Sequence, residues 1–292
     1  MAFIDDTREE FGVEPICDTL QVAPSSYYAA HKRVLSARAL RDAVLGPILL
    51  SLWVTNYRVY GVRKLWKAAL RAGHDVGRDQ VARLMRQLQI RGVRKGKKPK
   101  TTRSDPAAAR PPDLVNRRFT AHRPNALWVT DVTYVATWAG MGYVCFITDV
   151  YSRMIVGWRV AGHMRTDMVL DALEMARWQR GTHLEGLIAH SDAGSQFTSL
   201  RWGERLVELG AVPSVGSVGD SFDNALAESQ FSLYKDELVR GPRQGPWRSI
   251  DELELATLEW VTWYRTRLHG SLGDIPPAEH EEAYYAQLIA TR

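Results

Sequence analysis

The chain has 292 residues, of which 45% are hydrophobic and 24% charged, a composition typical of folded proteins with two or three domains. Its two cysteines, Cys17 and Cys145, are far apart and match neither a zinc-binding nor a disulfide spacing. The first residues, MAFIDDTREE, are acidic where a secretory signal would be basic, and the longest mostly apolar run, residues 44–54, is too short to span a bilayer. These features exclude a disulfide-rich secreted protein and favour a reducing cytoplasm without membrane insertion.

Charge is distributed unevenly along the chain, although the net charge is only +5. Residues 1–125 contain 24 Lys and Arg against 11 Asp and Glu, a net charge of +13, whereas residues 126–292 contain 14 against 22, a net charge of −8. Such asymmetry indicates an N-terminal part that binds a polyanion and a C-terminal part with a different chemical task.

Two helical pairs are expected in the N-terminal part. Residues 13–32 are predicted to form a helix, a turn and a second helix that begins at Pro24, a residue suited to the first turn of a helix. Residues 60–73 and 78–90 each have apolar side chains on one helical face, and Gly73 ends the first helix. Both pairs are candidates for DNA contact, with a plain packing hairpin as the alternative. In the second pair the candidate contacts are Arg78, Arg83 and Arg86, which lie away from the apolar face.

A basic linker follows these helices. Residues 91–103, RGVRKGKKPKTTR, contain seven basic side chains and no acidic one, and a proline-rich stretch continues to residue 125. Contact with phosphates is expected, because each neutralised phosphate releases counterions, and the alternative is a solvated linker. The candidate contacts are Arg94, Lys95, Lys97, Lys98 and Lys100.

From residue 126 the pattern changes to strands near 126–135, 142–149 and 154–160, a helix at 166–180 and a strand at 186–191, which indicates an α/β fold. Asp131 lies in the middle of the first strand, on the face of Leu127, Val129 and Thr133. A charge on an apolar face is costly without a partner. Asp131 is therefore a candidate site residue.

Two further carboxylates follow. Asp192 ends the short apolar run 186–191, so its side chain is expected at the edge of the sheet. Residues 212–224, rich in Gly and Ser, are expected to form a flexible loop before a helix from Asn224, whose apolar stripe consists of Ala227, Phe231, Tyr234 and Leu238. Glu228 lies at the rim of that stripe, with Asn224 and Lys235 on the same edge. A lone Glu there would be an ordinary solvated side chain.

Together, the three acids suggest a metal site. Three carboxylates at one sheet edge repel one another, and two hard cations would relieve that repulsion. A pair of such ions is the apparatus for in-line attack on a phosphodiester. Asp149 is either a fourth acid near the metals or, more readily, a turn residue, and His190 suits a packed core better than a ligand position. Arg267 with His269 either approaches a phosphate or caps the last helix, near residues 250–268.

The chain resembles a DDE transposase of the retroviral-integrase superfamily, and more narrowly the second-reading-frame product of the IS-three family of bacterial insertion sequences. In that family 35 residues separate the second and third acids, as they do here between Asp192 and Glu228 (228 − 192 − 1 = 35). Five motifs match in order: WVTDVTY, TDVYSRMIVGW, HSDAGSQF, SFDNALAES and WYRTRLHGSLGDIPP. Two departures are Ala193, where relatives often carry a basic residue, and Arg265, where Asn often follows the Tyr.

The resemblance implies a ribonuclease H-like catalytic core, a mixed sheet flanked by helices, preceded by a helix-turn-helix-type DNA-binding region. The expected division is a helical DNA-binding region at 1–90, the linker at 91–125, the integrase core at 126–245 and a helical extension at 246–292. Asp131, Asp192 and Glu228 would be the catalytic metal ligands for two Mg²⁺ (or Mn²⁺) ions, and Asn224 and Lys235 would hold the DNA end.

The implied reaction is cleavage at the ends of an insertion sequence followed by strand transfer into target DNA. The implied partners are the terminal inverted repeats, target DNA, the first-reading-frame product and further copies of the chain, in a bacterial, nucleoid-associated cytoplasmic setting. Two alternatives remain: a non-catalytic DNA-binding regulator of transposition, and a ribonuclease H-like nuclease that cuts and never joins.

Overall fold

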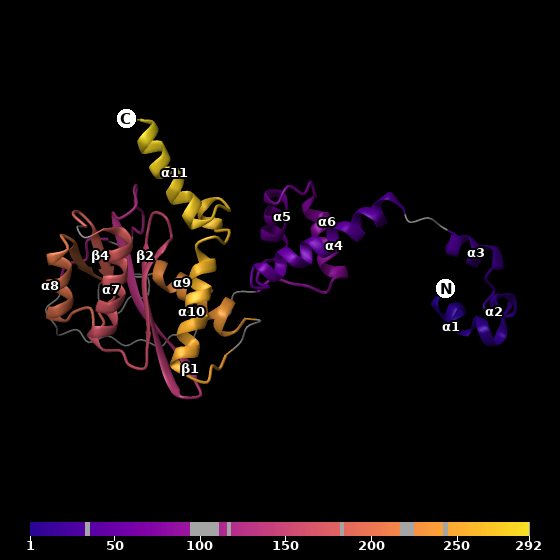
Figure 1. The fold of residues 1–292 in the computed structure, drawn as a ribbon, viewed down its shortest axis with the longest axis horizontal. Coiled ribbons are helices and arrows are strands. Elements are labelled where there is room, and N and C mark those ends of the chain that lie inside the picture. Colours follow the sequence, from indigo (N-terminus) through magenta and orange to yellow (C-terminus); the bar gives the residue numbers. More distant parts are fainter. Residues whose placement is uncertain are drawn as a thin grey trace. The chain divides into compact units, whose positions relative to one another are not determined.

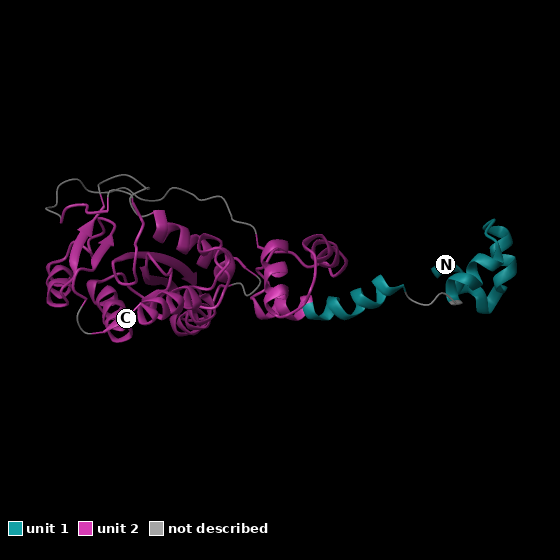
Figure 2. Cartoon of the chain, turned by 90° about the horizontal axis from the view of Figure 1, so that it is seen from above, with its two compact units in different colours: residues 1–48 teal, residues 49–292 magenta. Residues whose placement is uncertain are grey.

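A computed structural model describes residues 1–32, 36–93, 111–115, 118–181, 184–216, 225–241 and 245–291. Two compact units divide the chain, residues 1–48 and residues 49–292 (Figure 2). Over the described residues, no helix has both the length and the apolar character needed to cross a membrane.

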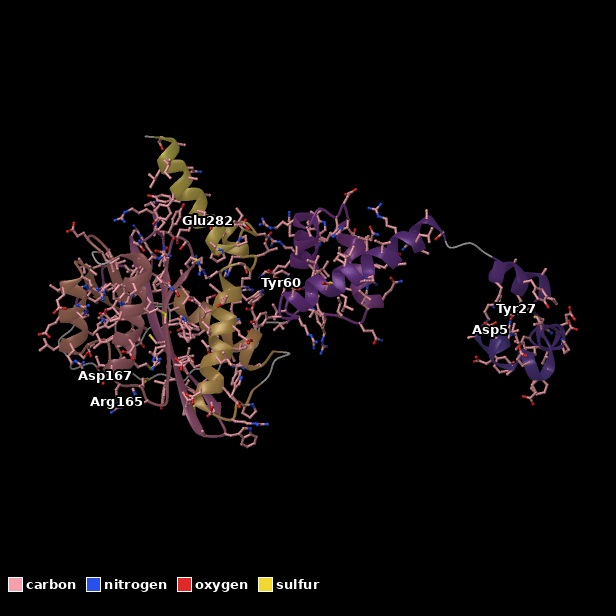
Figure 3. The ribbon with its side chains drawn as sticks, viewed as in Figure 1. Asp5, Tyr27, Tyr60, Arg165, Asp167 and Glu282 are labelled. Carbon is pink, nitrogen blue, oxygen red and sulfur yellow. The ribbon has the colours of Figure 1, made fainter. Side chains whose placement is uncertain are left out.

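The first unit contains α1 (Ala2–Phe11), α2 (Val13–Thr19), α3 (Pro24–Lys32) and the start of α4 (Ala37–Thr55). The expected helix, turn and helix at 13–32 are present as α2 and α3, and α3 begins at Pro24 as predicted. Ile4, on α1, shares a small core with Ile16, Cys17 and Tyr27. Tyr27 also donates a hydrogen bond of 2.8 Å to Asp5 (Figure 3). The sequence prediction omitted α1, which packs against α2.

The second unit begins with the predicted pair of helices, α5 (Val62–Arg71) and α6 (Arg78–Gln87). Each helix buries part of its apolar face, such as Leu65 on α5 and Leu84 on α6, whereas Leu70 of α5 is exposed. Gly73 has φ +83°, a conformation that glycine adopts readily and that ends the first helix of the pair.

A five-stranded mixed sheet forms the centre of the second unit (Figure 1). Its strands, in the spatial order β3-β2-β1-β4-β5, are β3 (Ile155–Ala161), β2 (Gly140–Asp149), β1 (Leu127–Thr137), β4 (Ile188–Ser191) and β5 (Val212–Val215). The pairs β1–β2 and β2–β3 are antiparallel, whereas β1–β4 and β4–β5 are parallel. This mixed topology is the one expected for the core.

Helices cover both faces of the sheet. On one face, α7 (Thr166–Arg180) and α8 (Leu200–Glu208) pack on a core that includes Trp128 and Cys145. On the other face, α9 (Ala225–Tyr234) and α10 (Ile250–Tyr264) pack on a core that includes Phe146 and Trp260. Alternation along β2 explains the division, because Cys145 and Phe146 point to opposite sides.

A close approach between α7 and β3 requires a glycine. A Cβ atom on Gly157 would lie 2.1 Å from the carbonyl oxygen of Ala172 in α7, a distance that no side chain tolerates. Gly157 therefore lets the helix backbone lie directly on the strand.

Two predictions for this region were incomplete. The segment expected to be a loop from residue 212 begins with strand β5, and residues 217–224 lie outside the described part of the chain. Pro213 lies within β5, where an edge strand tolerates a missing N–H donor, and this explains why the sequence looked like a loop. Helix α8 was also missed. The last expected helix ends at Tyr264 rather than near residue 268.

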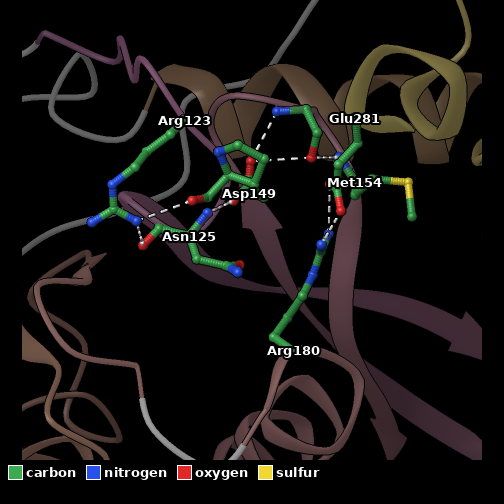
Figure 4. Close-up of polar contacts among 8 residues, drawn as sticks. Arg123, Asn125, Asp149, Met154, Arg180 and Glu281 are labelled. Atoms are coloured by element: carbon green, nitrogen blue, oxygen red, sulfur yellow. Dashed lines mark hydrogen bonds and ion pairs between the residues drawn. The ribbon is translucent and has the colours of Figure 1, made fainter. Parts of the chain in front are cut away.

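Further elements stand before and after α10 in the C-terminal part. The helix that begins as α9 continues as a π-helix, η1 (Lys235–Val239). After α10 come the 3-10 turn η2 (Gly270–Leu272) and α11 (Pro277–Ala290). A partly buried Arg180–Glu281 ion pair joins α11 to α7, and the Arg180 Nη2 donates a second hydrogen bond of 2.8 Å to the Glu281 Oε2 (Figure 4).

Candidate active site

The register of the sheet places Asp131 and Asp192 side by side. β1 and β4 run parallel from the pair Leu127–Ile188 to the pair Thr130–Ser191. Asp131 and Asp192 are the next residues along the two chains, at the carboxyl end of β4. Residues in register on neighbouring parallel strands point to the same face, and the strands are about 4.8 Å apart. The two carboxylates therefore share one edge of one face.

Helix α9 brings Glu228 to the same face. Ala227 is buried in a small core with Leu127 and Val129 of β1, so the first turn of α9 lies over the strand that carries Asp131. The predicted apolar stripe is confirmed, because Ala227, Phe231, Tyr234 and Leu238 are all buried. Glu228, at the rim of this stripe, is partly buried.

The charges of the other two acids act on Asp131. Burial raises the pKa of Asp131 well above its ordinary value of 3.8, and the charges of Asp192 and Glu228 raise it further. The Val132 N–H, which donates to Asp131 at 2.8 Å, and the charge of Lys235 act in the opposite direction. Burial also raises the pKa of Asp192, against a 3.1 Å hydrogen bond from the Gly194 N–H. Negative charge is thus concentrated where it is poorly solvated.

This environment suits a hard cation by its chemistry. The donors are carboxylate oxygens, the ligands that Mg²⁺ and Mn²⁺ prefer, and their mutual repulsion would be relieved by a bound positive ion. Within the described ranges, however, no three His, Cys, Asp or Glu side chains lie close enough together to hold a metal ion. Glu228 is thus within electrostatic range of Asp131 without completing a ligand set.

Lys235 lies next to strand β1, which carries Asp131. It begins η1, and its Nζ lies 4.9 Å from the centre of the Tyr134 ring in β1. Its charge is close enough to lower the pKa of Asp131. Asn224, the other residue predicted to hold a DNA end, lies outside the described residues.

The predicted basic contacts fall into two groups. Arg78, Arg83 and Arg86 are on α6; Arg78 and Arg86 are exposed, and Arg83 is partly buried and donates to Gln87 at 3.2 Å. The linker residues belong to the segment 94–110, outside the described part of the chain: Arg94, Lys95, Lys97, Lys98 and Lys100.

Two further polar residues of the core, His190 and Asp149, have structural contacts. His190 is buried, with Nδ1 at 2.9 Å from the Ser214 hydroxyl and its ring edge-on to Phe119. Asp149 is fully buried and accepts hydrogen bonds from the Asn125 N–H at 2.7 Å and from the Ser152 N–H at 2.8 Å (Figure 4). The readings of His190 as a core residue and of Asp149 as a turn residue agree with these contacts.

The sequence analysis missed a buried ion pair. Glu237 in η1 and Arg267 after α10 are 5% and 2% exposed, and their Oε1 and Nη2 atoms are 2.5 Å apart. Arg267 therefore pairs with a carboxylate rather than capping a helix. Next to it, burial lowers the pKa of His269 to about 2. The sequence signal that could have indicated a buried carboxylate is that Glu237 directly precedes Leu238 of the apolar stripe.

Comparison with protein families supports the two-part organisation. The model described as "HTH-like domain" matches residues 39–98, which include α5 and α6. Two models described as "Integrase core domain" match residues 121–221 and 209–277, which include the sheet and the three acids.

Similar proteins cover nearly the whole chain. The "Putative transposase for insertion sequence element IS986/IS6110" of Mycobacterium tuberculosis (strain ATCC 25618 / H37Rv) is 52% identical over 273 residues, 92% of this chain and 98% of that protein. The "Transposase for insertion sequence element IS629" of Shigella sonnei is 49% identical, over 99% of this chain and 97% of that protein. Among solved structures, the catalytic core domain of BIV integrase matches 56% of this chain and 99% of its own, with 23% identity and a TM-score of 0.41. The chain belongs to the IS-three family of insertion-sequence transposases, polynucleotidyl transferases of the DDE superfamily with a helix-turn-helix-like region and a ribonuclease H-like integrase core.

Proposed function

We propose that the chain cleaves DNA at the ends of an insertion sequence and joins the freed ends to target DNA by metal-dependent phosphoryl transfer. The observation that carries this proposal is the register that sets Asp131 beside Asp192 at one sheet edge, under the first turn of α9 with Glu228. Burial and mutual repulsion at this edge are what a divalent cation would relieve.

Each carboxylate has a proposed role. Asp131 would bind both Mg²⁺ (or Mn²⁺) ions, Asp192 one of them and Glu228 the other. Ions bound in this way lower the pKa of an attacking water or 3′-hydroxyl and stabilise the leaving oxygen. A strand, a strand end and a helix carry the three carboxylates, which limits the conformational freedom that would be lost in the reaction, and Glu228 would move toward the other two acids to complete the ligand set. Lys235 and Asn224 would hold the phosphates of the DNA end.

DNA would be held by the basic N-terminal part. Arg78, Arg83 and Arg86 on α6, together with the basic residues of the linker, would contact phosphates of the terminal repeats and the target. We also propose the division into a DNA-binding region at 1–90, a linker at 91–125, a core at 126–245 and an extension at 246–292. The first-reading-frame product and further copies of the chain are the proposed protein partners, in the bacterial cytoplasm near the nucleoid.

The test is cleavage and joining of a labelled oligonucleotide copied from the DNA that flanks the gene. The wild-type chain should nick it and produce a joined product with Mg²⁺ or Mn²⁺ and not with EDTA. Asp131→Asn, Asp192→Asn and Glu228→Gln should each abolish both products while DNA binding persists. The matched control is Asp167→Asn, which changes an exposed Asp that pairs with Arg201 at 2.7 Å on the core surface.

Each other outcome points to a different function. Nicking without joining would favour a nuclease. A variant that retains full metal-dependent activity would remove its residue from the site. Metal-independent products would refute the proposed chemistry. Binding without any reaction, both for this chain and for its fusion to the first-reading-frame product, would favour a regulator.

A further inference from the structure

The helix that carries Glu228 is fixed at its far end by the buried pair between Glu237 and Arg267. Glu237 lies nine residues after Glu228, which corresponds to about 13 Å of helix. Between the two, the helix changes from α to π geometry at Lys235. Single π turns are rare in helices and concentrate at functional sites.

The segment that carries Arg267 contacts residues just before α5 of the helix-turn-helix-like region. The backbone N–H of Leu268 donates to the Tyr60 hydroxyl at 2.8 Å, just before α5 (Figure 3). Trp263 stacks on Tyr57 with ring centres 4.7 Å apart, and the Arg267 guanidinium lies 5.2 Å from the Trp263 ring. The pair therefore lies where the helix of Glu228, the end of α10 and the segment before α5 meet.

Stability alone gives a poor account of this ion pair. Across the described residues, the Nε and Nη1 atoms of Arg267 and the Oε2 atom of Glu237 have no hydrogen-bond partner, although all three are buried. A cavity of about 260 Å³, lined in part by Lys64 and Asp236, adjoins the pair and has room for water. Burying two charges costs several kcal/mol each, and apolar replacement of such a pair often leaves stability unchanged or higher.

We propose that Glu237 and Arg267 are positioning residues for Glu228. Their ion pair fixes the rotation and axial position of the helix, and so sets where the Glu228 carboxylate stands over Asp131 and Asp192. The inference rests on the proposed function for its effect on catalysis. A displacement of about 1 Å at a reacting group can cost on the order of 100-fold in rate, so a clamp at the end of the helix is sufficient to matter.

The chain contains a matched control for this proposal. Arg180 and Glu281 form a second, partly buried Arg–Glu pair, with side chains 9% and 12% exposed, between α7 and α11 rather than on the helix of Glu228 (Figure 4). The test compares Glu237→Met/Arg267→Met with Arg180→Met/Glu281→Met in the full chain. Replacing both partners avoids leaving one buried charge unpaired.

Four quantities are measured for each variant: thermal stability, affinity for the DNA end, turnover at saturating DNA and Mg²⁺, and amide hydrogen exchange of the metal-free protein. For the 237/267 variant we expect DNA affinity within about twofold of wild type, turnover lower by about 10- to 100-fold, and faster exchange in α9 but not in α7. The 180/281 variant should retain turnover and the exchange of α9. Arg267→Lys, which keeps the charge, should recover part of the lost turnover.

The outcomes separate this inference from the proposed function. Equal effects of the two double variants, or turnover within about twofold of wild type for the 237/267 variant, would overturn the positioning role. If neither the wild-type chain nor its fusion to the first-reading-frame product cleaves DNA, the proposed function fails, and hydrogen exchange in α9 still decides whether the pair fixes the helix. If the 237/267 variant does not fold, Glu237→Gln replaces it, because glutamine keeps the shape and accepts one hydrogen bond; unchanged turnover and exchange would then refute the proposal.

Discussion

Removing the charge of Asp131 should make the metal-free protein more stable, although it should abolish the reaction. Asp131 in β1 and Asp192, the residue after β4, directly follow the last registered pair Thr130–Ser191, and burial raises the pKa of both carboxyl groups. In Asp131→Asn the amide oxygen can still accept the 2.8 Å hydrogen bond from the Val132 N–H. The substitution therefore removes repulsion and a poorly solvated charge at little structural cost.

The magnitude follows from the spacing of the strands. Two carboxylates about 5 Å apart repel by about 3 kcal/mol at an effective dielectric constant of 20, and by about 1 kcal/mol when water screens them fully. We expect the free energy of unfolding of Asp131→Asn to exceed that of wild type by about 1–3 kcal/mol at pH 7 in EDTA.

The sign of the pH dependence follows from the raised pKa. Above the ordinary value of 3.8, the unfolded chain releases the Asp131 proton before the folded chain does, so wild type loses stability as pH rises toward the folded pKa. Below that ordinary value the carboxyl is protonated in both states. The advantage of Asp131→Asn should therefore be absent below about pH 3.8 and fully developed above the folded pKa.

Urea unfolding at several pH values, with EDTA and with Mg²⁺, measures both effects. Mg²⁺ at 100 times its dissociation constant should stabilise wild type by about 2.7 kcal/mol and the variant much less. The control is Asp149→Asn, which should lose stability because Asp149 accepts several hydrogen bonds in its turn. The reasoning is refuted if Asp131→Asn is no more stable than wild type in EDTA at pH 7.

Three more predictions concern packing, protonation and DNA binding. Gly157→Ala should lower the free energy of unfolding by about 3 kcal/mol or more because its Cβ meets the α7 backbone, whereas Gly203→Ala in α8, where a Cβ meets nothing within 4 Å, should stabilise by up to about 1 kcal/mol in urea unfolding. His269, with a pKa of about 2, should show no NMR titration between pH 5 and 8, and a titration midpoint near 6.5 would contradict this. Because only the unfolded chain protonates His269 below about pH 6.5, His269→Gln should reduce the loss of stability as pH falls below that value. The variants that test DNA binding by α6 are Arg78→Gln, Arg83→Gln and Arg86→Gln. If the side chain contacts a phosphate, its replacement should reduce the slope of log affinity against log salt concentration by about one, and an unchanged slope would exclude that side chain from the contact.

Local residue patterns predicted most strands and helices of the core because the residues within each of these elements determine its type. The alternation around Asp131 and the stripe from Ala227 to Leu238 define a strand and a helix without reference to the rest of the chain. Strand β5 was missed because it has four residues, one of them Pro213, and owes its existence to pairing with β4. The adjacency of Asp131 and Asp192 likewise depends on register between strands distant in sequence.

The Glu237–Arg267 pair shows a different limit of sequence reasoning. Each residue taken alone looks like a surface charge on a helix, and nothing local indicates that η1 and the end of α10 come together. Burial of Glu237 raises its pKa, while the charges of Arg267 and Lys64 lower it, so the carboxyl depends on partners from two distant segments. Contacts of this kind require the tertiary structure.

The positive charge of the N-terminal part lies in residues 49–125 rather than in residues 1–48, which limits the segments expected to contact DNA. Residues 1–48 contain five Lys and Arg against seven Asp and Glu, a net charge of −2, whereas residues 49–93 contain nine against two, a net charge of +7. Residues 94–125 contain ten against two, a net charge of +8. Phosphate binding is dominated by such cations, and the helix-turn-helix-like match covers residues 39–98 rather than α2 and α3. Of the two helical pairs considered from the sequence, charge therefore favours α5 and α6 over α2 and α3 as the part of the region 1–90 that contacts DNA phosphates.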